Sequence, residues 1–466
     1  MNLSKTRPAL GVSGVLGALG ALLLSACSGG GGGTDADATS APLAPPVGTP
    51  QQAAQASVVR TLEVPAALAS PPFDAEKTLT LPPGFGIRLW ARVANARFMA
   101  LAPNGDVLVS VPDAGKIVLL RPRPNAVPEA FDYATGLRNP HDMVFHRIGS
   151  TTYLYLAESN RVTRSIYREG ENTSAARETV VADLPDNSTP ELQGRYGHEL
   201  KNIALSPEHK LYVSIASTCN ACVEDTVSDP VRGAIYQYNA DGSERRLFAR
   251  GLRNAEGLDF IPGTSLLWAA VNHRDEVRFP FDADADGDGS NDRGKIIPAY
   301  VDQHPPEPFT LVRDGGNYGW PFCNPLPNAA MSQLELVPDE ELNRGGSQVN
   351  CAGMDRASKG LPAHAAPLGF SFLHASNVAA AYRQGAVVAQ HGCWNCTRLS
   401  AGYKLSFFPF DAAGNAGAEI DVVTGFVTDP DARQVWGRPV DAIADSSGNL
   451  LISDDYAGAI YQLYSR

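Results

Sequence analysis

Four short polar segments stand at the ends of apolar, strand-like runs and carry residue types suited to proton transfer and anion binding. They contain His198, Arg253 and Arg438 and cover residues 195–202, 251–258, 271–276 and 437–442. A neutral imidazole accepts a proton near neutral pH, and a planar guanidinium binds a carboxylate through two parallel hydrogen bonds. The combination predicts a site that moves a proton beside an anionic ligand.

An acidic loop at 282–292 offers a second kind of chemistry, the binding of a hard cation. It reads D-A-D-A-D-G-D-G-S-N-D, and closely spaced carboxylates with a glycine that permits the turn are typical of calcium loops. The predicted ligands are Asp284, Asp286, Asp288 and Asp292, with Gly289 at the turn. Arg293 or Lys295 stands where an EF-hand has its bidentate glutamate. We expect a structural calcium here, against the alternative of a solvated acidic loop.

The start of the chain has the order of an export signal. Lys5 and Arg7 precede an apolar run from 9 to 24, and Leu-Ser-Ala then leads to Cys27. The run is too short for a membrane-spanning helix. The L-S-A-C tetrapeptide resembles the lipobox of bacterial lipoproteins, which implies cleavage after residue 26 and a lipid on Cys27. Ser28 after the cysteine favours the outer membrane, so we expect a periplasm-facing protein held to a bacterial membrane only by its lipid.

The remaining chain divides into a tether and one large body. Residues 27–57 are rich in Gly, Ala, Pro, Thr and Gln and predict a flexible linker. Residues 58–466 contain no second low-complexity linker, which favours one repetitive domain. The formal net charge of −12 without a visible basic stripe argues against a nucleic-acid partner. A small-molecule or protein partner is expected.

Six further cysteines suggest disulfides in an exported protein. They are Cys219 and Cys222, Cys323 and Cys351, and Cys393 and Cys396. Six thiols allow fifteen connectivities, and the two C-x-x-C neighbours favour local pairs with a Cys323–Cys351 bridge. Val223 and Thr397 follow the C-x-x-C pairs in place of histidine, so attachment of a c-type haem is not expected. A zinc site built from the four C-x-x-C cysteines remains the alternative.

A repeated hairpin pattern in the sequence predicts the fold. An alternating apolar strand, a Pro/Asn/Asp/Gly turn and a second alternating strand recur at 99–111, 142–159, 202–217, 257–271 and 441–455, with a divergent copy near 385–392. A spacing of about 45–60 residues is typical of four-stranded blades arranged radially. We predict an all-β, six-bladed β-propeller whose ring is closed by an early strand within 79–93. In such a fold the loops at one end of the channel carry the function.

Taken in order, the motifs resemble the glucose/sorbosone dehydrogenase family, the sugar dehydrogenases that use pyrroloquinoline quinone (PQQ), and most of all its sorbosone-dehydrogenase-like branch. The resemblance extends from about residue 79 to the end. It rests on LPPGFGIRLWA, GHELKN, GLRNAEGL, the RD of NHRDE, DGGNYGWPFC, HAAPLGFSF, QHGCWN, GYKLSFFPF, GRPVDAI and LLISDDYAGAIYQL.

The resemblance implies a role for each matching residue. His198 takes the position of the catalytic histidine, a base that accepts the hydroxyl proton while hydride leaves the substrate carbon. Arg253 and Asn254 match the R-N pair that holds PQQ, and Arg438 matches a carboxylate-binding arginine. Asn272, His273 and Arg274 correspond to the turn whose main-chain carbonyls bind calcium under PQQ.

Two positions depart from the family pattern. Gly197 replaces an acidic residue before the histidine, which affects the substrate contacts. Cys396 stands where relatives carry an arginine that contacts the cofactor, and Arg398 or Lys404 lies near enough in sequence to replace it.

The leading functional hypothesis is a PQQ- and calcium-dependent dehydrogenase that oxidises a sugar, polyol or sugar-derived aldehyde and passes electrons to a quinone or cytochrome. A calcium-dependent propeller hydrolase or lactonase is the alternative enzyme, with Glu158 and Asp275 as its candidate carboxylates. A propeller that binds a protein or glycan without catalysis is the third reading.

Overall fold

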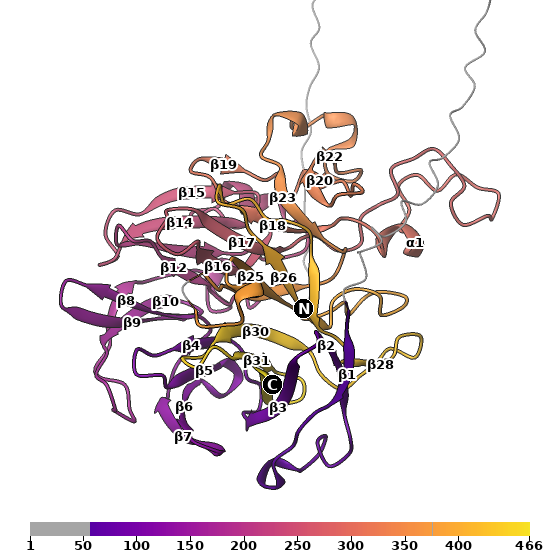
Figure 1. The fold of residues 1–466 in the computed structure, drawn as a ribbon. Coiled ribbons are helices and arrows are strands. Elements are labelled where there is room, and N and C mark those ends of the chain that lie inside the picture. Colours follow the sequence, from indigo (N-terminus) through magenta and orange to yellow (C-terminus); the bar gives the residue numbers. More distant parts are fainter. Residues whose placement is uncertain (1–55, 375) are drawn as a thin grey trace, which may run out of the picture. The chain divides into compact units, whose positions relative to one another are not determined.

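The computed structural model describes residues 56–374 and 376–466. The expected signal peptide (1–26), Cys27 and nearly all of the tether lie outside the described residues. Six sheets dominate the fold (Figure 1). Each is built on four antiparallel strands, and two of the sheets carry a fifth strand at their edge. The predicted six-bladed, all-β propeller is confirmed.

The first three blades are built from consecutive strands. The first blade holds β4 (Met99–Leu101), β5 (Val107–Val111), β6 (Lys116–Arg123) and β7 (Ala126–Ala134). The second holds β8 (Met143–Ile148), β9 (Thr151–Glu158), β10 (Arg161–Ile166) and β11 (Glu178–Val181). The third holds β12 (Ile203–Leu205), β13 (Lys210–Ile215), β14 (Ala234–Asn239) and β15 (Arg246–Arg250), with β19 (Gly316–Asn317) added in parallel at its edge.

The last three blades contain the insertions and the closure of the ring. The fourth has β16 (Asn254–Phe260), β17 (Leu267–Asn272), β18 (Glu307–Leu311) and β23 (Ala357–Leu361), with β21 (Ser332–Leu334) at its edge. The fifth has β24 (Pro367–Phe372), β25 (Gly385–Gln390), β26 (Lys404–Pro409) and β27 (Ile420–Val423). The sixth has β30 (Pro439–Ala444), β31 (Leu450–Asp454), β32 (Ala459–Ser465) and, as its outermost strand, β3 (Phe85–Arg92).

Small elements decorate this ring. Two-stranded sheets pair β1 (Val58–Thr61) with β2 (Thr78–Leu81), β20 (Cys323–Pro325) with β22 (Leu336–Pro338), and β28 (Val427–Asp429) with β29 (Gln434–Val435). The α-helix α1 (Pro298–Val301) has four residues. No helix in the described part of the chain has both the length and the apolar character needed to cross a membrane.

The innermost strands form a closed ring. β4 contacts β8, and the contacts continue through β12, β16, β24 and β30 back to β4. The inner hairpins turn where the sequence predicts, because Gly105 and Gly448 take φ values of 88° and 84° that side chains disfavour. β5 is buried at every residue, as expected for a strand packed between neighbouring blades.

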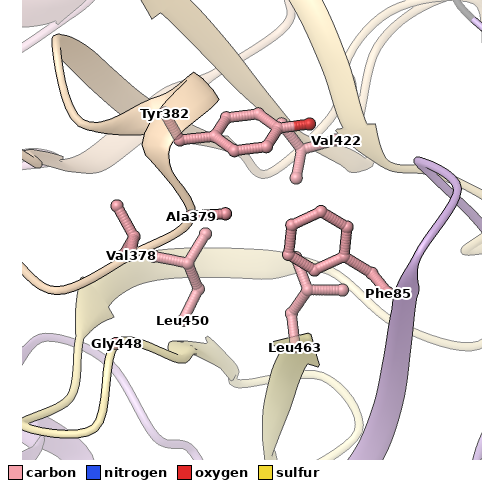
Figure 2. Close-up of a pocket in the computed structure, with 8 residues that line it drawn as sticks. All are labelled: Phe85, Val378, Ala379, Tyr382, Val422, Gly448, Leu450 and Leu463. Carbon is pink, nitrogen blue, oxygen red and sulfur yellow. The ribbon is translucent and has the colours of Figure 1, made fainter. Parts of the chain in front are cut away.

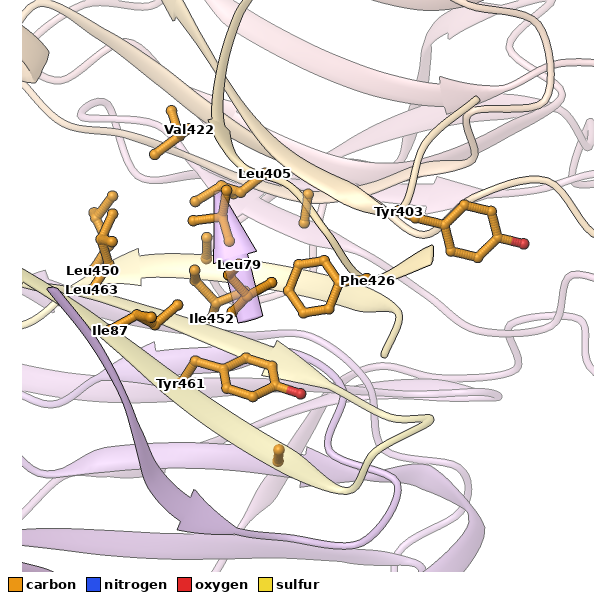
Figure 3. Close-up of a cluster of buried hydrophobic side chains, with 14 of the residues drawn as sticks. Leu79, Ile87, Tyr403, Leu405, Val422, Phe426, Leu450, Ile452, Tyr461 and Leu463 are labelled. Atoms are coloured by element: carbon orange, nitrogen blue, oxygen red, sulfur yellow. The ribbon is translucent and has the colours of Figure 1, made fainter. Parts of the chain in front are cut away.

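The largest apolar cluster joins the fifth and sixth blades to β2. Figure 3 shows Leu79, Phe426 and Tyr461 within this cluster, beside Leu405 and Ile452. Each of these side chains is almost fully buried, and burying one large apolar side chain contributes about 1.5–3 kcal/mol. The closing strand β3 adds Ile87 to the same cluster, so ring closure and core formation depend on each other.

Buried aspartates connect the innermost strands at every second blade interface. Asp142 accepts a hydrogen bond from Ile203 N of β12 at 2.9 Å, Asp259 from Phe372 N of β24 at 3.2 Å, and Asp441 from Met99 N of β4 at 2.9 Å. Each carboxylate also accepts the N–H of the residue that follows it. Burial raises the pKa of Asp259 and of Asp441 to about 7.

Candidate active site

The start of each innermost strand lies at the same end of the propeller as the end of the second strand. The register sets Asn254 opposite Asn272 and Pro439 opposite Asp454. Four antiparallel strands return the chain to the end from which it started, so every blade begins at this end. Residues just before β12, β16, β24 and β30, and just after β13, β17, β25 and β31, are therefore gathered there.

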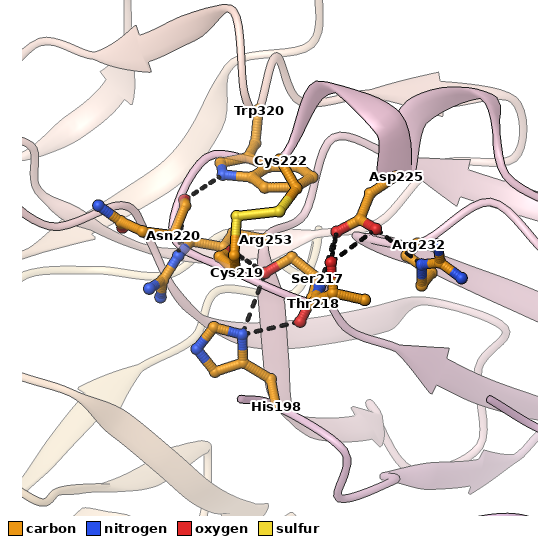
Figure 4. The surroundings of a disulfide bond; sticks show 10 residues. All are labelled: His198, Ser217, Thr218, Cys219, Asn220, Cys222, Asp225, Arg232, Arg253 and Trp320. Carbon is orange, nitrogen blue, oxygen red and sulfur yellow. Dashed lines mark hydrogen bonds and ion pairs between the residues drawn. A yellow bond between two sulfur atoms is a disulfide. The ribbon is translucent and has the colours of Figure 1, made fainter. Parts of the chain in front are cut away.

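His198 lies before β12 and is oriented by the loop after β13. Its Nδ1 lies 2.9 Å from the Ser217 carbonyl oxygen and 3.1 Å from Ser217 Oγ (Figure 4). Because a carbonyl only accepts, Nδ1 carries the proton and Nε2 keeps a free lone pair. Burial and the neighbouring Arg253 guanidinium lower the pKa of His198 to about 4. The ring is therefore a neutral base with its accepting nitrogen unoccupied by this loop.

Arg253 lies immediately before β16 and is buried against two loops. Its Nε donates to the Asn220 carbonyl at 3.1 Å, and its Nη2 lies 3.3 Å from Asp275 Oδ2. Asp275 also accepts from His364 Nδ1 and from Asn395 Nδ2, each at 3.1 Å. Burial raises the pKa of Asp275, but these donors and the Arg253 charge outweigh burial and hold it below its usual range.

His364 brings a further positive charge to the site. Its Nε2 faces the Val301 carbonyl at 2.7 Å and its Nδ1 faces the Asp275 carboxylate. Both ring nitrogens therefore carry protons. Burial lowers the pKa of His364, yet the hydrogen bond to Asp275 and the charge of Glu307 more than compensate and raise it.

Arg438 reaches the same end from the sixth blade. Its Nε and Nη2 donate to the carbonyls of His391 and Gly392 at 3.0 and 2.8 Å, and its guanidinium lies over the Tyr403 ring at 5.5 Å. Among the described residues, Arg438 Nη1 has no hydrogen-bond partner and could bind a ligand.

A second histidine and carboxylate pair lies beside Arg438. His391 Nε2 donates to Asp455 Oδ1 at 2.8 Å, and Arg97 Nη1 binds the other Asp455 oxygen at 2.9 Å. Burial lowers the pKa of His391, so the ring is neutral with Nδ1 as its acceptor. His391 comes from the fifth blade, Asp455 from the sixth and Arg97 from the first.

Hydrogen bonds link His198 to Arg253, and the turn 391–396 links them to Arg438. His198 binds Ser217, whose N–H donates to the Arg253 carbonyl at 2.8 Å. Arg253 binds Asp275, Asp275 binds Asn395, and the turn that contains Asn395 supplies the carbonyls for Arg438. The structure thus brings His198, Arg253 and Arg438 together at one end of the channel.

The predicted calcium turn lies beside this network. Asn272 Oδ1 is buried without a hydrogen-bond donor, and an orphaned amide oxygen suits a hard cation. The His273 N–H donates to Glu307, and Arg274 binds Asp339 at 2.7 Å and Glu341 at 2.9 Å. The side chain of Arg274 is therefore committed to structure. The main chain and Asn272 Oδ1 remain as candidate ligands of a cation, and both ring nitrogens of His273 are also buried without a hydrogen-bond partner.

Asn254 is the first residue of β16 and is buried. Its Nδ2 donates to Glu256 Oε1 at 2.9 Å. The other Glu256 oxygen lies 3.7 Å from His141 Nε2, so the channel wall stays polar beneath the site.

The two proposed replacements for the missing arginine are engaged elsewhere. Arg398 is exposed and binds Asp431 at 2.7 Å. Lys404 binds Glu419 at 2.9 Å and Asp421 at 2.7 Å within the fifth blade. Neither cation joins the hydrogen-bond network of Arg253 and Arg438, whereas His364, Asn395, His391 and Asp455 do lie next to it. None of these four was assigned a role from sequence, although all of them lie inside the motifs that carry the family resemblance.

The acidic loop gathers three of its four predicted ligands. Ligand oxygens of Asp284, Asp286 and Asp292 lie within 4.8 Å of one another, and Asp288 is not in this group. Asp292 is buried and bound by Lys295 Nζ at 2.7 Å. The ammonium group already supplies positive charge to the cluster.

The six cysteines form three disulfides. They join Cys219 to Cys222, Cys323 to Cys351 and Cys393 to Cys396. The first bridge closes the turn beside His198 and Arg253 (Figure 4), and the third closes the turn that contains Asn395. The four C-x-x-C cysteines therefore lie in two separate bridges instead of one zinc site.

An apolar pocket lies at the opposite end of the fifth and sixth blades (Figure 2). It is lined by Phe85, Val378, Ala379, Tyr382, Val422, Gly448, Leu450 and Leu463. Leu450 pairs with Ala444 at the end of β30, away from Arg438. This pocket offers neither cations nor a base.

The carboxylates of the hydrolase alternative are both paired. Glu158 is fully buried, binds Arg161 at 2.7 Å and accepts the Arg138 N–H at 2.8 Å. Asp275 is held by Arg253, His364 and Asn395. The geometry therefore favours binding of an anionic ligand over a ring of free carboxylates.

Comparisons with known proteins agree with this fold. The chain belongs to the TrAA12-like family, whose sequence model matches residues 79–466. A protein of Borreliella burgdorferi, described only as uncharacterized, is 27% identical over 289 residues, which are 61% of this chain and 64% of that protein.

Solved structures share the fold at low sequence identity. The Trichoderma reesei enzyme of carbohydrate-active enzyme family AA12, in its iodide structure, is 21% identical with a TM-score of 0.65, covering 83% of this chain and 97% of that one. The holo form of the PQQ domain of pyranose dehydrogenase from Coprinopsis cinerea is 18% identical with a TM-score of 0.66, covering 86% and 98%. The soluble aldose sugar dehydrogenase of Escherichia coli in its apo form is 14% identical with a TM-score of 0.53, covering 82% and 100%.

Proposed function

We propose that this chain is a PQQ-dependent oxidoreductase that oxidises a hydroxyl or aldehyde group of a sugar or polyol. The observation that carries the proposal is the network that links the neutral base His198 to Arg253, Asp275 and His364, with Arg438 at the same end of the channel. The family membership and the pyranose dehydrogenase and aldose sugar dehydrogenase structures of similar fold support it.

The residues present fit such a cofactor. PQQ carries three carboxylates, and Arg253 and Arg438 are fixed cations that could hold them. Both ring nitrogens of His364 already contact protein acceptors, so His364 would contribute only its charge beside Asp275. Bound there, PQQ supplies a quinone carbonyl that accepts hydride. Asn272 Oδ1 and the carbonyls of residues 272–274 would hold a calcium ion that polarises this carbonyl, and the calcium structure of the Trichoderma reesei enzyme supports the proposal.

His198 would act as the base. Its Nδ1–H is fixed by Ser217, which leaves Nε2 to accept the substrate hydroxyl proton. Because burial keeps the ring neutral above about pH 4, the base needs no activation at physiological pH. His391, held by Asp455, is the competing candidate for the same role.

The cellular setting remains part of the proposal. Cleavage before Cys27 and lipidation of that residue would anchor the body to a bacterial membrane, facing the periplasm. A respiratory quinone or cytochrome would then take the electrons. The acidic loop would bind a second, structural calcium through Asp284, Asp286 and Asp292 after displacing Lys295.

Reconstitution tests this function. The purified chain is incubated with PQQ and calcium, and dye reduction is followed with a panel of aldoses, polyols and sorbosone. We expect reduction that depends on PQQ, on calcium and on the sugar. The absence of reduction with every substrate while PQQ is bound would leave a binding protein and contradict the oxidoreductase.

A further inference from the structure

The turn closed by the Cys219–Cys222 disulfide holds the two charged residues at the centre of the site. Asn220, inside this turn, uses both ends of its side-chain amide on the main chain of Asp275: Nδ2 donates to the Asp275 carbonyl at 2.8 Å, and Oδ1 accepts the Asp275 N–H at 2.7 Å. This paired contact fixes the backbone of the loop after β17.

The main chain of the same residue fixes Arg253. The Asn220 carbonyl accepts from Arg253 Nε at 3.1 Å and from Trp320 Nε1 at 3.0 Å (Figure 4). One residue of the third blade thus determines where an arginine of the fourth blade and the carboxylate that pairs with it can lie. The Trp320 indole adds support from the segment between β19 and β20.

The turn is held at both ends. At one end Ser217 Oγ donates to the Cys219 carbonyl at 2.8 Å. At the other, the buried Asp225 accepts from Thr218 N at 2.7 Å and binds Arg232 at 2.7 Å. Between them the disulfide spans only three residues of sequence. Without it, the short turn would have to hold Asn220 by these end contacts alone.

We propose that the disulfide-closed turn 219–222 is a positioning element of the active site, with Asn220 as the positioning residue that aligns the Arg253 guanidinium and the Asp275 carboxylate for the anionic cofactor. The identity of the cofactor rests on the proposed function. The alignment of Arg253 and Asp275 stands on the contacts of this chain alone.

Two substitutions separate positioning from general stability. Asn220→Ala removes both contacts to Asp275. The matched control is Asn328→Ala, because the half-buried Asn328 likewise uses its amide on main-chain atoms, donating to the Ser332 carbonyl at 2.8 Å and accepting from Ala330 N at 3.1 Å. Full-length purified protein is titrated with PQQ at saturating calcium, and thermal unfolding is recorded for each variant.

We expect Asn220→Ala to weaken PQQ binding about ten-fold or more while Asn328→Ala changes it less than about two-fold, because the lost hydrogen bonds support a charged group. Asn220→Asp keeps the acceptor but loses the donor, so it should fall between wild type and alanine. Equal PQQ affinities for Asn220→Ala and Asn328→Ala would overturn the proposal.

A cofactor-free measurement distinguishes this inference from the proposed function. The pKa of His364 is raised by its hydrogen bond to Asp275, so release of Asp275 should lower it. The imidazole signal of His364 in the apoprotein, assigned with a His364→Gln variant, is titrated by NMR. A lower pKa in Asn220→Ala supports the alignment even if wild type binds no PQQ, and an unchanged pKa rejects it.

The disulfide is tested in the same way. Cys219→Ser/Cys222→Ser should reproduce the loss of PQQ affinity and the fall in the His364 pKa. The control Cys323→Ser/Cys351→Ser removes a bridge that spans 28 residues of sequence and does not hold Asn220. If the control weakens PQQ binding as much as the Cys219 variant, the turn has no special role and the proposal fails.

Discussion

His198 carries its proton on Nδ1 because this N–H donates a hydrogen bond to the Ser217 carbonyl. Nε2 is therefore left to accept a proton from the substrate. His198→Gln should lower kcat by about 10²–10⁴-fold, the usual contribution of a positioned base, and change PQQ affinity little. His146→Gln is the control, since His146 pairs with His209 in the second and third blades. A full loss of activity in His391→Gln with His198→Gln active would move the role of base to His391.

The pH dependence of the wild-type enzyme follows from the same residue. The pKa of His198 is lowered to about 4. Nε2 is therefore protonated below that pH and is free to accept a proton above it. We expect kcat/KM to rise with pH through about 4 and then to level off. A rise centred near pH 6.5 would show that the base has an unshifted pKa and is not this buried ring.

Arg253 contributes geometry as well as charge. Its Nε and Nη2 contact different partners, Asn220 and Asp275, and lysine offers one point charge in place of the planar fork. Arg253→Lys should raise the Kd for PQQ about ten-fold or more, measured by titration. Arg398→Lys, at an exposed arginine paired with Asp431, should leave the Kd unchanged. An equal effect of the two substitutions would contradict the site.

Individual site residues were only partly predictable from sequence. His198, Arg253 and Arg438 stand in recognisable motifs at strand ends. Asp275 gains its role from His364 and Asn395, which are 89 and 120 positions away, and no local pattern reveals such a contact. Arg398 and Lys404 show the opposite case. They lie near the turn in sequence and were therefore predicted to contact the cofactor, but each forms ion pairs with acidic residues outside the site.

At the level of elements, buried aspartates link the innermost strands, and Asp441 gives the clearest test. Its pKa is raised from 3.8 to about 7 by burial. The Asp441 carboxyl therefore loses its proton at a lower pH in the unfolded chain than in the folded protein. As pH rises from about 4 to 7, this difference lowers the free energy of unfolding by at most about 1.4 kcal/mol per pH unit.

Asp441→Asn should remove that part of the pH dependence. Urea unfolding at pH 5 and at pH 7.5 should show a smaller loss of stability with rising pH in the variant, although the variant is weaker overall because it loses one accepted hydrogen bond. Asp411→Asn, in an exposed turn, is the control. A pH dependence identical to wild type would show that Asp441 is already ionised in the folded protein at pH 5.

The hairpin repeat predicted the inner half of each blade well, because its strands are buried on both faces and read as apolar runs such as β5. The outer half of the fourth blade was not predictable. β18 and β23 are separated by the segment containing β20, β21 and β22. This insertion interrupts the regular spacing of strands on which the prediction of the blades depends. The acidic loop and α1 fall in the preceding insertion, between β17 and β18.

For the whole molecule, closure of the ring by β3 matches the sequence expectation of an early strand that pairs with the last unit. The predicted export signal lies outside the described residues and stays a prediction. Cys27→Ser should abolish labelling with a fatty acid and release the protein from bacterial membranes into the periplasmic fraction. Retention in the membrane fraction would contradict the lipid anchor.

The central claim is that one end of this propeller binds PQQ through Arg253 and Arg438. Equilibrium titration of the purified apoprotein with PQQ, with and without calcium, tests it most directly. The account predicts one PQQ per chain with a micromolar or lower Kd, tighter with calcium and weakened in Arg438→Lys as in Arg253→Lys. No binding at micromolar PQQ with calcium present, or binding that neither substitution weakens, would contradict it.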